Sequence, residues 1–179
     1  YYYFKRSRSD ELNAGADGES VVVNNGMLFF LENDNELAGV LAHEVAHNMM
    51  GHVDASQTNA MAGGLIGLAL DAVVASQGGA RTDMTRAGYE AGMHSYSVEF
   101  EEEADYIGMY IMARAGYDVR AVPDIWRRMS LEFPDNVYNA QTHPSNAARY
   151  VAINKTIDEI NQKRKRRLPL IPEMLNNPS

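Results

Sequence analysis

Helical periodicity dominates the hydrophobic pattern of the chain, and strand-type runs occur only near its beginning. Apolar residues recur every three or four positions in one segment in particular, at Leu37, Val40, Leu41, Val45 and Met49. This period predicts an amphipathic helix. Asn33 or Asp34 can cap its start and Gly51 follows its last turn, so we expect a helix from about residue 34 to residue 51 or a little beyond.

The remaining pattern predicts a mostly helical α+β fold with a small, early sheet. Val21–Val23 is a β-branched run typical of a strand, and Asn24-Asn25-Gly26 predicts a turn. The apolar run Met27–Leu31 suits either a strand or a buried helical turn. Further helices are expected over residues 82–115, with a break near 92–97, over 119–133 and over 144–163.

The domain organisation expected from this pattern is simple, because 179 residues are enough for one ordinary core. We predict a single domain over residues 13–167. Residues 1–12 are predicted to be a detached lead-in. Residues 168–179 contain three prolines and are expected to form an extended tail.

The amino-acid composition excludes several kinds of functional site. The chain has no cysteine, which excludes disulfides, thiolate metal sites and a cysteine nucleophile. Its net charge of −8 argues against a nucleic-acid partner. The basic run Lys163–Arg167 is interpreted as a solvated helix end rather than a binding patch.

One apolar segment, Met61–Ala75, is rich in glycine and contains Asp71. It is shorter than the roughly 20 apolar residues of a membrane span. We interpret it as a buried or groove-lining helix, with membrane contact but no span as the alternative.

The candidate chemistry centres on His43-Glu44-Val45-Ala46-His47, inside the predicted helix. Residues four apart share one helix face, so both imidazoles can reach one zinc ion at about 2.0–2.1 Å. Glu44 lies beside them and can take a proton from water and pass it to the leaving amine.

A catalytic zinc needs a third protein ligand and one open position. A nearby histidine in the common spacing is excluded, because Met50 and Val53 occupy the glycine and histidine positions of that pattern. His52 is predicted to project from another face and to be structural or at the rim.

A carboxylate from residues 99–105 is the remaining candidate for the third ligand. Glu101 and Asp105 are four apart on a helix with a buried side. One of them can bind the metal while the other accepts a hydrogen bond from a ligand imidazole. His143, before Pro144, and Arg149 are candidates for stabilising an oxyanion.

Taken together, these segments resemble the HtpX, CAAX-prenyl-protease and Oma-type zinc metallopeptidases, and most of all their soluble, cell-envelope BepA-like branch. The matching residues are Leu37–His47, His52, Glu101 with Asp105, Ala115–Asp118, and Thr142–Pro144 with Arg149. The sequence departs from the family pattern at Val98, which follows Ser97 where relatives have arginine, and at Asp17-Gly18-Glu19, where relatives have Pro-Gly-Gly.

The resemblance implies a gluzincin-type domain in which a small sheet places its edge strand beside the active-site helix. It implies one Zn²⁺ on His43, His47 and Glu101, with Asp105 supporting a ligand and Glu44 as the base; Glu102 is the alternative third ligand. It also implies that His143 and Arg149 belong to the active site, and that His143 is a fourth ligand in a latent state of some relatives.

The expected function is zinc-dependent hydrolysis of unfolded or extended protein substrates that add as a strand beside Val21–Asn24. The alternatives are a latent or non-catalytic zinc-bearing chaperone or docking module with envelope protein partners, a metal hydrolase acting on other compounds, and a structural zinc site. The resemblance implies a bacterial periplasm or cell envelope, and any signal peptide would lie outside this sequence.

Overall fold

The helix predicted from the apolar period is α2, Asp34–Met50, in the computed structural model. Asn33 caps it, since the Asn33 side chain accepts hydrogen bonds from the backbone N–H groups of Asn35 and Glu36 at 3.0 and 3.1 Å. Gly51 ends it with φ of 73°, a left-handed conformation that favours glycine. The prediction for this helix is confirmed.

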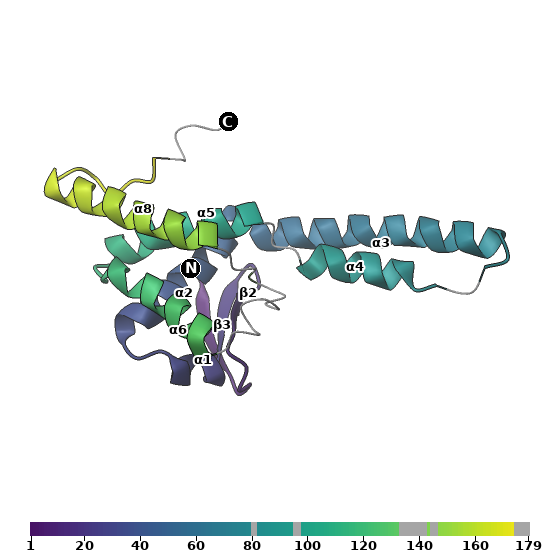
Figure 1. The fold of residues 1–179 in the computed structure, drawn as a ribbon, viewed down its shortest axis with the longest axis horizontal. Helices are drawn as coiled ribbons and strands as arrows, with labels where there is room; N and C mark the ends of the chain where they lie inside the picture. Colours follow the sequence, from purple (N-terminus) through teal and green to yellow (C-terminus); the bar gives the residue numbers. More distant parts are fainter. Residues whose placement is uncertain (80–81, 95–97, 133–142, 144–146, 174–179) are drawn as a thin grey trace.

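The structure describes residues 1–79, 82–94, 98–132, 143 and 147–173 (Figure 1). The other helices in them are α1 (Asn25–Phe30), α3 (His52–Ser76), α4 (Met84–His94), α5 (Val98–Arg114), the 3₁₀ helix η1 (Val119–Ala121), α6 (Val122–Glu132) and α8 (Ala147–Lys165). The run Met27–Leu31 is therefore helical. The predicted loop at residues 133–136, and the helix start at Pro144, lie outside the described residues.

A small mixed sheet lies against these helices. It contains β1 (Tyr3–Ser7), β2 (Ala14–Ala16) and β3 (Ser20–Asn24) in the order β1-β3-β2. β1 runs parallel to β3 and β2 runs antiparallel to it. The mostly helical α+β class predicted from the sequence is confirmed.

Two expectations about this sheet are wrong. Tyr3–Ser7 belongs to the sheet and is not a detached lead-in. Its side chains are largely exposed, so it lacks the buried alternation by which a strand is recognised in a sequence. β3 is the central strand, paired on both sides, so no substrate can add beside Val21–Asn24.

The main core is formed where α2, α5 and α8 pack together with η1. Tyr110 and Met112 of α5, Ile153 and Ile160 of α8, and Ala46 of α2 are buried there. A second cluster joins the sheet to α1 through Val21, Val23, Met27 and Ala14. Most of the buried apolar side chains therefore lie around α2, α5 and α8.

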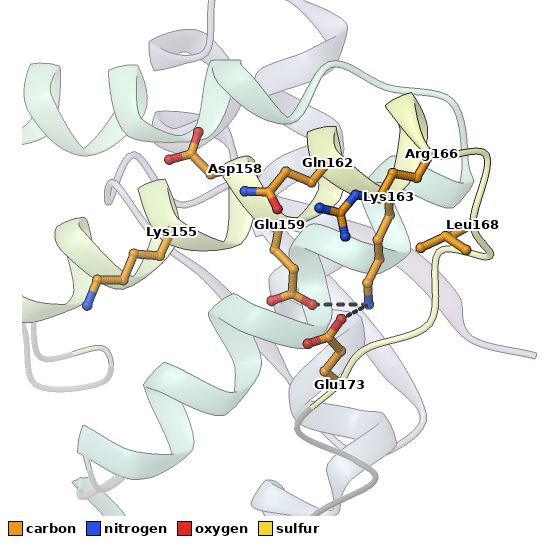
Figure 2. A pocket seen from close by; sticks show the side chains of 8 residues that line it. All are labelled: Lys155, Asp158, Glu159, Gln162, Lys163, Arg166, Leu168 and Glu173. Carbon is orange, nitrogen blue, oxygen red and sulfur yellow. Dashed lines mark ion pairs between the residues drawn. The ribbon is translucent and has the colours of Figure 1, made fainter.

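The segment after α8 folds back along that helix. Its residues Leu168 and Glu173 line a pocket together with side chains of α8 (Figure 2). The Lys163 ammonium lies 3.1 Å from Glu159 and 3.2 Å from Glu173, and it donates a hydrogen bond to the carbonyl of Ile171. Lys163 is buried, so the interpretation of the whole basic run as solvated is wrong for this residue. Its charge fastens the tail to α8.

α3 and α4 form an arm that projects from the body (Figure 1). By length and composition, α3 is the one helix of the described residues that is apolar enough to cross a membrane, and only 11% of its apolar window is buried. The interpretation of Met61–Ala75 as a buried helix is therefore wrong. The core is already filled by α2, α5 and α8, and α3 extends past it.

Candidate active site

Two helices bring the predicted site residues together. α2 presents His43, Glu44 and His47, and α5 presents Glu101 and Asp105. The helices approach closely at Gly108 of α5, where an added Cβ would lie 3.0 Å from the backbone nitrogen of His43. The absence of a side chain at this position lets α5 come near enough for its carboxylates to reach the imidazoles of α2.

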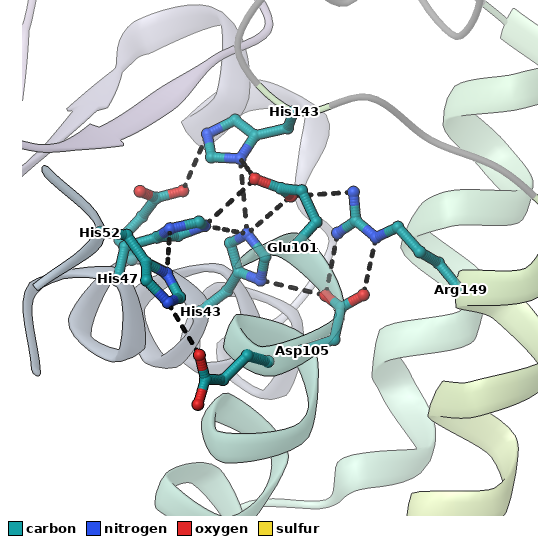
Figure 3. Close-up of polar contacts among 9 residues, drawn as sticks. His43, His47, His52, Glu101, Asp105, His143 and Arg149 are labelled. Atoms are coloured by element: carbon teal, nitrogen blue, oxygen red, sulfur yellow. Dashed lines mark hydrogen bonds and ion pairs between the residues drawn. The ribbon is translucent and has the colours of Figure 1, made fainter. Parts of the chain in front are cut away.

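Four side chains converge at the centre of the site (Figure 3). Candidate ligand atoms of His43, His47, Glu101 and His143 all lie within 4.8 Å of one another. The Nε2 atoms of His43 and His47 are 3.0 Å apart, and His47 Nε2 lies 3.3 Å from a Glu101 oxygen. His143 Nδ1 is 2.9 Å from Glu101 Oε1 and 3.5 Å from His43 Nε2. This is a cluster that can hold one metal ion.

Asp105 contacts the outer nitrogen of the His43 ring and so fixes its orientation. His43 Nδ1 lies 3.0 Å from Asp105 Oδ1, on the side of the ring opposite the cluster. Burial alone would lower the pKa of this imidazole, but the carboxylates of Asp105 and Glu101 raise the pKa of His43 to about 10. The site therefore attracts positive charge at its centre.

His47 is oriented by His52. Their Nδ1 atoms are 3.0 Å apart, and His52 Nε2 lies 3.1 Å from a Glu103 oxygen. The His52 ring also stacks on Phe100, with centroids 4.4 Å apart. Burial is the main reason that the pKa of His47 is lowered to about 3, which keeps this imidazole neutral and able to bind a metal.

His52 was expected to lie on another helix face and to be structural or at the rim; it is buried and contacts His47, so it is not at the rim. The left-handed Gly51 ends α2 and begins α3, so His52 does not follow the helical register of His47. Glu103 was missed by the sequence reasoning, because it looked like one member of a solvated acidic run. The sequence carries no signal that separates Glu103 from Glu102, which is exposed in the structure.

Arg149 of α8 is buried behind the two carboxylates. It donates to both Asp105 oxygens at 2.8 and 2.9 Å, and its Nη1 lies 2.8 Å from Glu101 Oε2. Its guanidinium also lies over the Trp126 ring. The structure therefore places Arg149 on the far side of Glu101 and Asp105 from the imidazoles (Figure 3).

Glu44 lies beside the cluster. Its Oε1 is 3.5 Å from His143 Nε2, and its Oε2 is buried and accepts no hydrogen bond from the described residues. A buried carboxylate oxygen without a donor is costly. Such an atom is explained by a group that the protein binds there, such as a metal ion or water.

Comparison with known proteins agrees with this geometry. The model of peptidase family M48 matches residues 2–157. The chain belongs to peptidase family M48. This confirms the family resemblance found in the sequence, and it makes the chain a metalloprotease by family.

Curated proteins similar to the chain are named as proteases. A beta-barrel assembly-enhancing protease of Escherichia coli O157:H7 is 33% identical over 136 residues, which is 72% of this chain and 28% of that protein. A putative beta-barrel assembly-enhancing protease of Vibrio cholerae is 32% identical over 74% of this chain and 29% of that protein. The mitochondrial metalloendopeptidase OMA1 of Saccharomyces cerevisiae is 31% identical over 81% of this chain and 43% of that protein. The chain thus spans less than half the length of these relatives.

Proposed function

We propose that the chain is a zinc-dependent endopeptidase in which His43, His47 and Glu101 hold the metal. The observation that supports zinc most directly is the spacing of the ligand atoms. Atoms at about 2.0–2.1 Å from a tetrahedral zinc lie about 3.3 Å from one another. His43 Nε2 lies 3.0 Å from His47 Nε2 and 3.4 Å from Glu101 Oε2, and His47 Nε2 lies 3.3 Å from Glu101 Oε1, so either carboxylate oxygen is within reach of one ion.

The hydrogen bonds on the outer nitrogens support the same conclusion. We assign the Nδ1 proton of His43 to the bond with Asp105, and that of His47 to the bond with His52, whose own Nε2 donates to Glu103. The two Nε2 atoms can approach to the observed 3.0 Å when a proton or a metal ion lies between them.

The residues of the chain divide the catalytic work. Bound zinc supplies a Lewis acid that polarises the scissile carbonyl and makes water more acidic. The Glu44 carboxylate accepts the proton of the attacking water and delivers it to the leaving nitrogen. His143, which faces Glu44 across the site, donates a hydrogen bond to the developing oxyanion.

Arg149 is proposed to position Glu101 and Asp105 rather than to contact the substrate. Its guanidinium is engaged with Asp105 and Glu101, so we replace the oxyanion role expected from the sequence with one of holding these carboxylates toward α2. Arginine suits this task because its planar fork binds a carboxylate through two parallel bonds.

An extended substrate is proposed to add along β2. Asn13 O and Asp17 N bond to β3, so the alternation of an antiparallel ladder turns the backbone groups of Ala14 and Ala16 to the outer side. β2 is an edge strand of the sheet, and the backbone N–H of Gly18, two residues after its end, donates to Asn48 of α2 at 2.7 Å. A peptide paired there would run beside the helix of Glu44.

The test of this function is Glu44→Gln. We expect the variant to keep its zinc, because Glu44 is not a ligand, and to lose cleavage of labelled casein by about 10²–10⁴-fold. Glu102→Gln is the matched control, because Glu102 is exposed on α5, and it should cleave at the wild-type rate. Proteolysis retained by Glu44→Gln would remove Glu44 from the mechanism.

A second candidate function is a latent or non-catalytic zinc protein. It is favoured by His143 Nδ1, which completes the set of four ligand atoms and so takes the position that water needs. If this arrangement is the resting state, His143→Ala opens that position and raises casein cleavage severalfold. If His143 acts only on the oxyanion, the same variant lowers cleavage, so one assay separates the two roles.

We propose that the protein acts in the bacterial cell envelope on unfolded or extended proteins. The support is the likeness to proteases named for beta-barrel assembly, while the likeness to OMA1 points to mitochondria. Fractionation of the producing cells tests the location. Recovery of the protein with the cytosolic fraction would contradict it.

A further inference from the structure

The outer surface of α3 is apolar and open. Its large exposed side chains are Met61, Leu65, Ile66, Leu68, Leu70 and Val73, each between 49% and 68% exposed. Exposed apolar residues are common singly, but a contiguous group of this kind marks a surface that meets an apolar partner.

The apolar side chains cover most of the free circumference of the helix. Successive helical residues are turned by about 100°, so Leu65, Ile66, Leu68 and Leu70 point in four directions that span about 200°. A partner helix or a groove covers a narrower stripe along one side. A surrounding apolar medium contacts all of these directions together.

The packing of α3 on α4 leaves these side chains outside. An added Cβ on Gly63 would lie 2.2 Å from the carbonyl oxygen of Gly88, and one on Gly67 would lie 2.0 Å from that of Met84. The two backbones therefore touch through glycines spaced four apart on α3. Helices in lipid pack in this manner, with small residues between them and large apolar residues facing outward.

Charge is absent from the open face. Asp71 is the one ionisable residue between Ala55 and Gly79, and it is turned toward α4. Its carboxylate accepts hydrogen bonds from the Thr82 hydroxyl at 2.6 Å and from the backbone N–H of Thr85 at 3.0 Å. From Ala55 to the end of α3, the face that carries Leu65 and Leu68 thus presents no charge to its surroundings.

We propose that α3 lies on a lipid bilayer, with its open face in the boundary between headgroups and acyl chains. The helix is about 38 Å long and would reach across a bilayer, but α4 packs along it and spans only about 16 Å. α4 also exposes the ion pair of Arg86 and Glu90. Insertion of the whole arm would place that pair in hydrocarbon, whereas a helix lying in the interface keeps it in water.

Vesicle flotation tests this proposal independently of the metal site. The wild-type chain, with and without chelator, is mixed with vesicles of phosphatidylcholine and phosphatidylethanolamine, which carry no net charge. The test variant combines Leu65→Gln, Leu68→Gln and Leu70→Gln. The matched control combines Phe29→Gln, Leu131→Gln and Ile171→Gln, which are exposed apolar residues away from the arm. Helix content and melting temperature by circular dichroism show that both variants are folded.

We expect the wild type and the control to float with the vesicles, and the arm variant to lose about tenfold or more in partition coefficient. Raised salt should leave wild-type binding unchanged, because the contact is apolar. The proposal is overturned if the wild type does not float, or if the arm variant floats equally well. A lipid-free dimer that the arm variant abolishes, with no vesicle binding, would assign the face to a second copy of the chain.

Discussion

At the scale of single residues, the two imidazoles that α2 contributes each have an acidic partner on the outer side, directly or through His52. Asp105 contacts His43 directly, and Glu103 acts on His47 through His52. These bonds select the tautomer that leaves Nε2 available to a metal. The proposed metal site therefore predicts that the outer carboxylates contribute to metal affinity without touching the metal.

The first prediction concerns Asp105. Asp105→Asn removes the charge that holds His43 and leaves Arg149 without its bidentate partner. We expect zinc affinity to fall about 10–100-fold, measured by competition with a chromophoric chelator. Asp158→Asn is the control, because Asp158 is an exposed aspartate of α8 outside the site. This variant should bind zinc like the wild type. Unchanged affinity in Asp105→Asn would contradict the orienting role.

Much of this constellation could be predicted from the sequence, because the residues concerned obey a helical period. The spacing of four in His43 and His47, and again in Glu101 and Asp105, is sufficient to place each pair on one face. The role of His52 could not be predicted in this way. It depends on the left-handed turn at Gly51, which interrupts the period.

At the scale of elements, the site depends on how closely α5 packs against α2. Gly108 has Ala42 O and the His43 backbone within 3.1 Å of the position that a Cβ would take. A helix interior normally disfavours glycine. Here glycine allows the approach that brings Glu101 to the imidazoles.

The second prediction follows from this approach. Gly108→Leu must push the helices apart, and overpacking of this kind costs about 1–3 kcal/mol in the free energy of unfolding. We expect a lower midpoint in urea and a loss of bound zinc. Gly64→Leu, on the arm, should leave zinc content unchanged. A zinc-replete Gly108→Leu protein would show that the close approach is unnecessary.

The sheet shows where prediction of elements fails. β3 was predicted from its β-branched run, whereas β1 was not, because its residues are polar and exposed and its parallel pairing with β3 spans many residues. Pairing between distant segments is decided by the tertiary fold and not by local pattern. The edge at which a substrate can add was consequently assigned to the wrong strand.

At the scale of the whole molecule, the core helices and the projecting helix α3 both contain many apolar residues, but only the core helices are buried. The mostly helical class followed correctly from the periodicity. The placement of α3 did not, because composition alone does not distinguish a helix that fills a core from one that projects from it. That distinction appears only when the core is seen to be complete without it.

The central claim is that α2 and α5 together hold one zinc ion, and elemental analysis of the purified chain tests it most directly. We predict one zinc per wild-type chain, a similar value for Glu102→Gln, and a value near zero for Glu101→Gln after dialysis against a weak chelator. Equal zinc content in Glu101→Gln and the wild type would contradict the account.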